Sequence, residues 1–129
     1  MRRRFAGAAV ARLATIDERR RPHVVPLCFV LGGDVLYSAV DEKPKKTRRL
    51  KRLENIRSHP HVAVLVDHYE EDWSRLWWVR VDGAAEVTES EAGLDALAAK
   101  YEQYRAARPA GPVIAITPDR WRSWIPSET

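Results

Sequence analysis

The chain has 129 residues, 45% of them hydrophobic, which is enough for one hydrophobic core and too little for a second independent domain. Its 22 lysines and arginines against 18 acidic residues give a formal net charge of +4, which favours anionic partners. The single cysteine, Cys28, excludes an intrachain disulfide, and no stretch approaches the roughly 20 apolar residues of a transmembrane helix. We therefore expect a single cytoplasmic domain over residues 1–129, with no membrane partner.

The N-terminal part predicts a short helix over residues 2–9, followed by strands over residues 13–16, 24–31 and 35–37. The sequence Gly-Gly-Asp at residues 32–34 marks a hairpin between the second and third strands. Pro26 cannot donate to a sheet ladder, so we place it at a sheet edge or bulge, where a ligand can meet unpaired backbone groups. An ordinary edge proline explains this residue equally well.

The middle of the chain predicts a helix and then an antiparallel pair of strands. Pro44 suits a first helical turn, and apolar residues recur at helical spacing from there until Ser58. Valines alternate over residues 61–66, and a long aromatic strand is predicted over residues 73–87, with a bend at Gly83.

The C-terminal part predicts one more helix and one more strand. Thr88 and Glu91 have capping-box spacing before an amphipathic helix. Residues 113–116 supply a sixth strand, and Trp121 and Trp124 are expected in a basic tail beyond it. This order of elements lacks the regular alternation of a parallel α/β sheet, so we expect a mostly β fold, a six-stranded antiparallel barrel with two to three helices.

Positive charge is concentrated between Lys43 and Arg52, where seven of ten residues are lysine or arginine. Backbone N–H groups at a helix start, the Thr47 hydroxyl and the Lys46 ammonium group suit a phosphate. A solvated basic helix face accounts for the same composition. Three arginines at residues 19–21 extend the positive charge if they lie nearby, so an extended polyanion is a further possible ligand.

Three of the five tryptophans, Trp73, Trp77 and Trp78, fall in one predicted strand. Because Trp77 and Trp78 are adjacent, they face opposite sides of a strand. One can fill the core while the other faces a subunit interface or an aromatic ring system, although core packing explains either residue taken alone. The four histidines show no metal-ligand spacing, and the chain has no glycine-rich phosphate motif and no nucleophile elbow.

Several stretches, taken in order, resemble the pyridoxamine-phosphate-oxidase-like split β-barrels of the FMN-binding type. The match is best with the actinobacterial branch that uses the deazaflavin coenzyme F420. The resemblance is carried by residues 13–17, 21–27, 35–39, 46–50 and 55–66. Residues 18–21 depart from it, because members commonly carry Asp-Gly in this turn.

The resemblance implies a homodimer that holds its cofactor at the subunit interface, together with a set of cofactor-binding residues. Lys46, Thr47 and Arg48 would bind the phosphate, with Lys45 and Arg49 as neighbouring charges. Backbone groups of Pro26, Tyr37 and Ser38 would face the ring or the ribityl chain, and Trp73 and Trp77 would reach the partner's cofactor.

The resemblance further implies an oxidoreductase that transfers hydride between coenzyme F420 and a small unsaturated substrate. The anionic oligoglutamate tail of this coenzyme suits the cationic excess better than FMN does, and FMN is the alternative cofactor. Two other readings stay open, a non-catalytic cofactor carrier and a nucleic-acid-binding module, although we expect no nucleic-acid partner. No residue stands out as a proton donor, and no metal site is expected.

Overall fold

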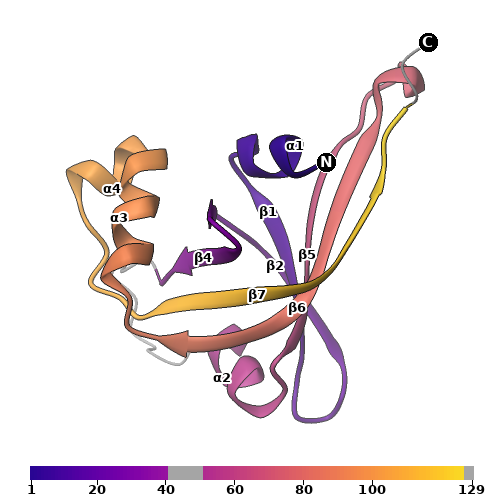
Figure 1. Ribbon diagram of the computed structural model, residues 1–129. Helices are drawn as coiled ribbons and strands as arrows, with labels where there is room; N and C mark the ends of the chain where they lie inside the picture. Colours follow the sequence, from indigo (N-terminus) through magenta and orange to yellow (C-terminus); the bar gives the residue numbers. More distant parts are fainter. Residues whose placement is uncertain (41–50, 127–129) are drawn as a thin grey trace.

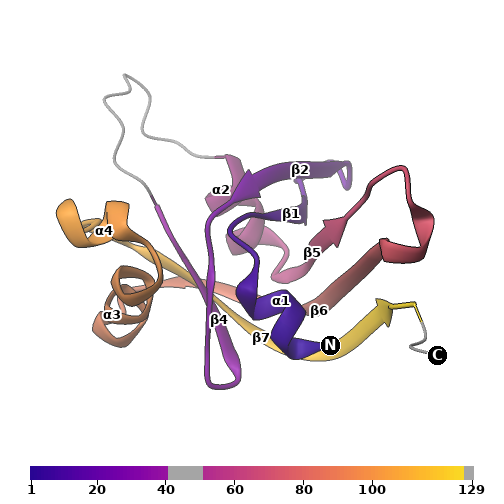
Figure 2. The same ribbon diagram turned by 90° about the horizontal axis from the view of Figure 1, so that it is seen from above.

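The computed structural model describes residues 1–40 and 51–126 (Figure 1). Within these ranges, seven strands form one antiparallel sheet in the order β2-β1-β5-β6-β7-β4-β3, which is strongly curved (Figure 1, Figure 2). The strands are β1 (Ala11–Ile16), β2 (Pro22–Leu27), β3 (Val30–Gly32), β4 (Val35–Ala39), β5 (His61–His68), β6 (Trp77–Thr88) and β7 (Val113–Trp124). The helices are α1 (Arg2–Gly7), α2 (Lys51–Ser58), α3 (Glu91–Lys100) and α4 (Glu102–Ala106), with a 3-10 turn η1 at Trp73–Arg75. The mostly β fold predicted from the sequence is confirmed.

The sheet has seven strands instead of the predicted six, because the apolar run over residues 24–31 is broken at Phe29. The Phe29 N–H donates to the Tyr101 hydroxyl at 3.0 Å, and the Phe29 carbonyl accepts from Lys100 Nζ at 2.8 Å. Both backbone groups of Phe29 are therefore used by side chains at the end of α3. The run divides into β2 and β3, which occupy the two ends of the sheet order.

The two long strands differ from the prediction at one end each. Strand β6 begins at Trp77 and not at Trp73, because the Asp72 carboxylate accepts from the backbone N–H and the hydroxyl of Ser74 and so stabilises η1. The prediction of a basic tail after residue 116 is wrong, since β7 continues to Trp124. Strand β6 offers pairing partners over this whole length, and Trp78 lies opposite Trp124.

The predicted helix after Thr88 is two helices, so the described chain has four helices where two to three were expected. Tyr101 adopts an extended backbone, with φ −115° and ψ 121°, and separates α3 from α4. Its hydroxyl lies 2.8 Å from the carbonyl oxygens of Ala9 and Phe29, which fixes the break to two other segments. Ser90, not Thr88, caps α3 by accepting the Gly93 N–H at 3.0 Å.

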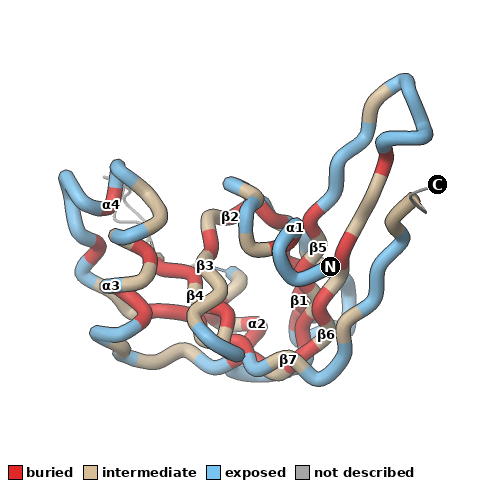
Figure 3. The backbone as a smooth tube through the Cα atoms, turned by 45° about the horizontal axis from the view of Figure 1, so that its top comes forward, coloured by how far each residue is buried: buried red, intermediate tan, exposed pale blue. Residues whose placement is uncertain are grey.

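The core is divided into two clusters of buried side chains. The buried residues that alternate along the strands are red in Figure 3. Helix α1 contributes Phe5 to the larger cluster, and α2 contributes Leu53 and Ile56. Helix α3 covers the smaller cluster with Leu94 and Leu97. The core therefore uses one face of strands β1, β5 and β6, and the residues between the buried ones point outward.

The predicted bend at Gly83 is confirmed, since the β6–β7 register shifts between Asp82 and Gly83. A Cβ atom at Gly83 would lie 2.4 Å from the Thr117 carbonyl oxygen, so only glycine allows this approach of the two strands.

We predict that Gly83→Ala destabilises the fold by about 1–3 kcal/mol, because backbone must move to admit the methyl group. Urea denaturation followed by circular dichroism measures the change. Gly7→Ala is the matched control, because nothing lies within 4 Å of its Cβ position. Equal urea midpoints for Gly83→Ala and Gly7→Ala would contradict the prediction.

Lys100 is expected to make stability depend on pH, because burial lowers the pKa of its ammonium group to about 8 from the usual 10.5. Between these two values the unfolded chain binds more protons, so the free energy of unfolding rises with pH. We predict that in Lys100→Met the free energy of unfolding no longer rises in this way. Denaturant midpoints at pH 7.5 and 9.5 measure the change. Lys51→Met, at an exposed lysine, should keep it. A rise of the same size in Lys100→Met would show that another group causes it.

Candidate functional site

The outward face of β2, β1, β5 and β6 carries a regular array of side chains that is set by the strand register. In one row, Ala14 lies beside Val24 on β2 and Ala63 on β5. In the next row, Leu65 lies between Arg12 and Arg80. These residues alternate with buried core residues, so the core on the other face determines which side chains point outward.

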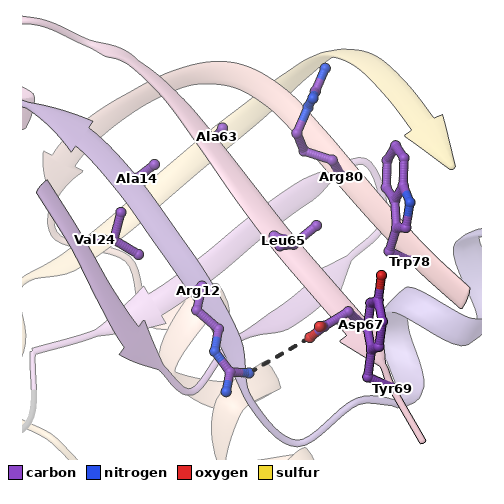
Figure 4. Close-up of a pocket in the computed structure, with 9 residues that line it drawn as sticks. All are labelled: Arg12, Ala14, Val24, Ala63, Leu65, Asp67, Tyr69, Trp78 and Arg80. Carbon is purple, nitrogen blue, oxygen red and sulfur yellow. Dashed lines mark ion pairs between the residues drawn. The ribbon is translucent and has the colours of Figure 1, made fainter. Parts of the chain in front are cut away.

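A cleft of about 410 Å³ opens on this outward face (Figure 4). Its lining comes from all four strands and the residue after β5: Arg12, Ala14, Val24, Ala63, Leu65, Asp67, Tyr69, Trp78 and Arg80. Small and aliphatic side chains form the floor, and Trp78 and Tyr69 stand together at one end (Figure 4). The volume falls within the ~300–1,000 Å³ range of small-molecule sites. The lining suits a planar apolar group.

Arginines give the cleft and its continuation on β7 an excess of positive charge. Arg80 makes a two-bond ion pair with Asp82, with Nε to Oδ1 at 2.8 Å and Nη2 to Oδ2 at 3.1 Å. Arg122 lies opposite Arg80 on β7, and Arg120 lies opposite Asp82. Since these pairs are exposed or half-buried, they contribute little to stability and can exchange partners at low cost.

Arg12 lies across β5 from Arg80 and approaches Asp67 only loosely, with Nη1 to Oδ1 at 4.0 Å (Figure 4). With Asp67 and the exposed Glu86 of β6 included, four arginines and three acidic residues carry the charge of this face. The face therefore favours an anionic ligand or an acidic counterpart.

Strand β2 borders the cleft through Val24 and stands at one end of the sheet order. Its backbone groups that point away from β1 have no neighbouring strand within the described residues. The expectation that Pro26 lies at a sheet edge is confirmed, since it is exposed on β2 opposite Arg12. His23 on the same strand has a buried Nδ1 with no hydrogen-bond partner in the described chain. The outer backbone of β2 thus offers free donors and acceptors to a ligand, whereas His23 points to the same face as the buried Thr15.

The Asp17 carboxylate holds the turn that joins β1 to β2. Its Oδ1 accepts the backbone N–H groups of Arg19 at 2.8 Å and Arg21 at 2.9 Å, and its Oδ2 accepts Arg21 Nε at 3.1 Å. Arg20 takes the left-handed conformation, with φ 65°. The turn therefore forms without the Asp-Gly pair of the family, and the pairing of β1 with β2 is as expected.

Five of the predicted cofactor-binding residues, Lys45, Lys46, Thr47, Arg48 and Arg49, lie outside the described residues. These residues stay predictions.

Tyr37 and Ser38 lie on β4, between β3 and β7 and away from the cleft. The Ser38 hydroxyl is buried and donates to the Cys28 carbonyl at 2.7 Å. The Tyr37 ring lies against Gly93, where a Cβ atom would come within 2.7 Å of it. Both side chains are therefore used within the fold, and at Tyr37 the backbone of β4 has a neighbouring strand on each side, with Val30 on β3 and Ala115 on β7.

The predicted opposite orientation of Trp77 and Trp78 is confirmed. Trp77 packs against the larger core cluster and stacks on His68, with ring centroids 6.4 Å apart. Trp78 lines the cleft, although it was not among the predicted cofactor-binding residues. Adjacency in the sequence indicated that one of the two faces outward, but only the strand register decides which. Trp73 is 73% exposed on the connection between β5 and β6.

Among the residues that the structure describes, no group of three or more histidine, cysteine or acidic side chains is arranged to hold a metal ion. No helix within the described ranges is both long and apolar enough to cross a membrane.

The model of one protein family, described as Pyridoxamine 5'-phosphate oxidase, matches residues 1–125. A search among curated proteins gave no match. Among solved structures, a FAD-binding protein from Mesorhizobium loti is 22% identical, with TM-score 0.65 over 92% of this chain and 86% of that chain. A FAD binding protein from Mycobacterium smegmatis is 17% identical, with TM-score 0.63 over 95% of this chain and 89% of that chain. A heme binding protein from Mycobacterium smegmatis is 18% identical, with TM-score 0.75 over 93% of this chain and 50% of that chain. At these identities the likeness shows the fold alone.

The three hydrogen bonds at the β1–β2 turn lower the pKa of Asp17 below its usual 3.8. A carboxylate with a lowered pKa stabilises the fold above pH 3.8, and this contribution is lost as the pH falls through the folded-state pKa. We predict that Asp17→Ala has a lower urea midpoint than the wild type at pH 7, and that the difference narrows as the pH falls below 3.8. Asp119→Ala, at an exposed aspartate, is the control. An unchanged midpoint at pH 7 would count against the role of Asp17.

Proposed function

The chain belongs to the pyridoxamine 5'-phosphate oxidase family, and from this premise we propose that it is a coenzyme F420-dependent reductase that works as a homodimer. The observation that carries the proposal is the free edge of β2 beside an apolar, aromatic and cationic cleft. The net charge of +4 supports an anionic coenzyme.

The residues at this edge fit a flavin-type ring. Such a ring has carbonyl and N–H groups along one side, and the outer backbone groups of β2 are complementary donors and acceptors. Pro26 adds no N–H donor, so the pattern of donors along β2 is uneven and can favour one orientation of the ring.

In this proposal Lys46, Thr47 and Arg48 bind the phosphate, Lys45 and Arg49 add charge, and the backbone at Pro26 faces the ring or ribityl chain. Trp73, which is exposed, extends toward the coenzyme of the partner. The resemblance assigns Tyr37, Ser38 and Trp77 to the coenzyme as well, but Tyr37 and Ser38 lie on β4 away from the cleft and Trp77 packs against the larger core cluster. When bound, the coenzyme supplies a hydride from C5 to an electron-poor double bond. The chain positions the two reactants and excludes water, and solvent supplies the proton that completes the reduction.

FMN is the second candidate, and the similarity to FAD-binding proteins supports it. FMN and F420 share a tricyclic ring, a ribityl chain and a phosphate, so the same edge accepts either. Only F420 carries a multiply anionic oligoglutamate tail. The four arginines on the outward face and its β7 continuation exceed the three acidic residues there, and this excess favours F420.

Two non-catalytic alternatives are separated by simple measurements. A cofactor carrier would hold reduced coenzyme without turnover. The similarity to a heme binding protein supports this alternative. Stopped-flow oxidation of the bound reduced coenzyme by enones, quinones and tetrapyrroles tests for turnover. A nucleic-acid-binding module would bind oligonucleotides tightly with a steep salt dependence.

We predict that the purified protein binds F420 more tightly than FMN in side-by-side fluorescence titrations, and that Lys46→Glu abolishes F420 binding. The charge reversal places a carboxylate where the coenzyme phosphate is expected to bind. Arg3→Glu makes the same charge change at an exposed residue of α1 and should retain binding. Unchanged affinity of Lys46→Glu would remove the phosphate assignment. Tighter binding of FMN would replace F420 in the proposal.

A further inference from the structure

The turn between β1 and β2 carries three consecutive arginines at residues 19–21, and it lies beside helix α2 (Figure 1, Figure 2). Glu18 of this turn shares a polar pocket of about 30 Å³ with residues from one side of α2: Lys51, Glu54, Asn55 and Ser58. The three arginines therefore lie next to the described end of the basic stretch 43–52, and the two segments form one surface.

This surface has more cations than carboxylates. Residues 17–21 and α2 together hold six cations, Arg19, Arg20, Arg21, Lys51, Arg52 and Arg57, against three acids, Asp17, Glu18 and Glu54. Arg21 is bound to Asp17, with Nε to Oδ2 at 3.1 Å, which is the turn's only ion pair within the described residues. Arg19 and Arg20 are exposed, so both can bind an external anion without first breaking an ion pair of the described chain.

The backbone of the turn is fixed by hydrogen bonds, so its arginine side chains start from a defined position. The Asp17 carbonyl accepts the Arg20 N–H at 2.8 Å, and the Asp17 N–H donates to the Arg21 carbonyl at 2.9 Å. With φ at 65°, Arg20 takes the left-handed conformation that glycine adopts without strain. The backbone thus favours glycine here, and a role of the exposed side chain accounts for the arginine.

We propose that Arg19, Arg20 and Lys51 bind the oligoglutamate tail of the coenzyme, which rests on the proposed function and its assignment of the phosphate to residues 46–48. In the coenzyme, the tail follows the phosphate. Lys51 follows Arg48 by three positions, so the start of α2 lies within about 10 Å of the predicted phosphate ligands along the chain. The tail carboxylates then meet Lys51 first and the two arginines of the turn next.

The size and the chemistry of the surface suit a short polycarboxylate. A guanidinium group forms charge-assisted hydrogen bonds with a carboxylate, and a flexible tail can adjust to two of them. A nucleic-acid backbone is typically held by about 6–10 phosphate contacts, which is more than Arg19, Arg20 and Lys51 supply.

The arginines of β7 are the alternative place for the tail. Arg120 and Arg122 lie opposite Asp82 and Arg80 on the outward face. The end of β7 that carries them lies away from α2 in both views of the fold (Figure 1, Figure 2). The two locations can therefore be tested separately by substitution.

The test compares two forms of F420 in fluorescence titrations at low ionic strength, one with several glutamates and one that keeps the phosphate but lacks the tail. The wild type should bind the tailed form about 5-fold more tightly, because each exposed arginine–carboxylate pair contributes a small stabilisation. Arg19→Gln combined with Arg20→Gly, the turn variant, should bring this ratio close to one and leave the affinity for the tailless form unchanged. At about 1 M salt the wild-type ratio should also approach one, because the charges are screened.

Two controls separate loss of the tail contact from other defects. Glycine suits the left-handed backbone at residue 20, so the turn variant should fold, and circular dichroism with a urea midpoint checks this. Arg120→Gln combined with Arg122→Gln, the β7 variant, removes the same charge from exposed positions and should keep the wild-type ratio.

Equal affinity of the wild type for both forms, or loss of the ratio in the β7 variant and not in the turn variant, would overturn the inference and leave the proposed function standing. Tight binding of a single-stranded oligonucleotide that the turn variant loses would assign the surface to nucleic acid and also overturn the inference. A wild type that binds neither form of F420 would overturn the proposed function and the inference together.

Discussion

The alternation of side chains along β1, β5 and β6 is the constraint on which the rest of the molecule depends. Leu13, Val64, Val79 and Val81 are fully buried on one face, so every residue between them must point to the other. Shifting any of these strands by one residue would expose its whole buried set. The core thus determines the composition of the outward face, including which of two adjacent tryptophans stands in the cleft.

The second determinant of the architecture is a set of hydrogen bonds around Phe29. Tyr101 and Lys100 take both backbone groups of Phe29, and the Tyr101 hydroxyl also contacts the Ala9 carbonyl. These bonds join the end of α3 to the β2–β3 connection and to the segment after α1. These hydrogen bonds end β2 early and leave this strand at the edge of the sheet. The proposed coenzyme-binding backbone of β2 meets the cleft there.

Local patterns in the sequence predicted the features that depend on neighbouring residues: the edge position of Pro26, the bend at Gly83 and the divergence of Trp77 and Trp78. Two errors have local causes, the Asp72–Ser74 turn before β6 and the cap of α3 at Ser90, and the larger ones come from long-range contacts. The break at Phe29 depends on Tyr101, which lies 72 residues away. The continuation of β7 to Trp124 depends on the length of β6, and no run of residues near Trp124 has a strand pattern. The cleft could not be predicted at all, since it requires the register of four strands.

The proposed coenzyme edge and the cleft meet at Val24, which lines the cleft from β2. A ring bound along the outer backbone of β2 would lie at the rim of the cleft and not over its floor, because Ala14 and Ala63 lie farther in, on β1 and β5. A single sheet edge would supply hydrogen bonds to the ring but leave one of its faces in water. The proposed function therefore needs a second element to cover that face, and a partner subunit would supply it.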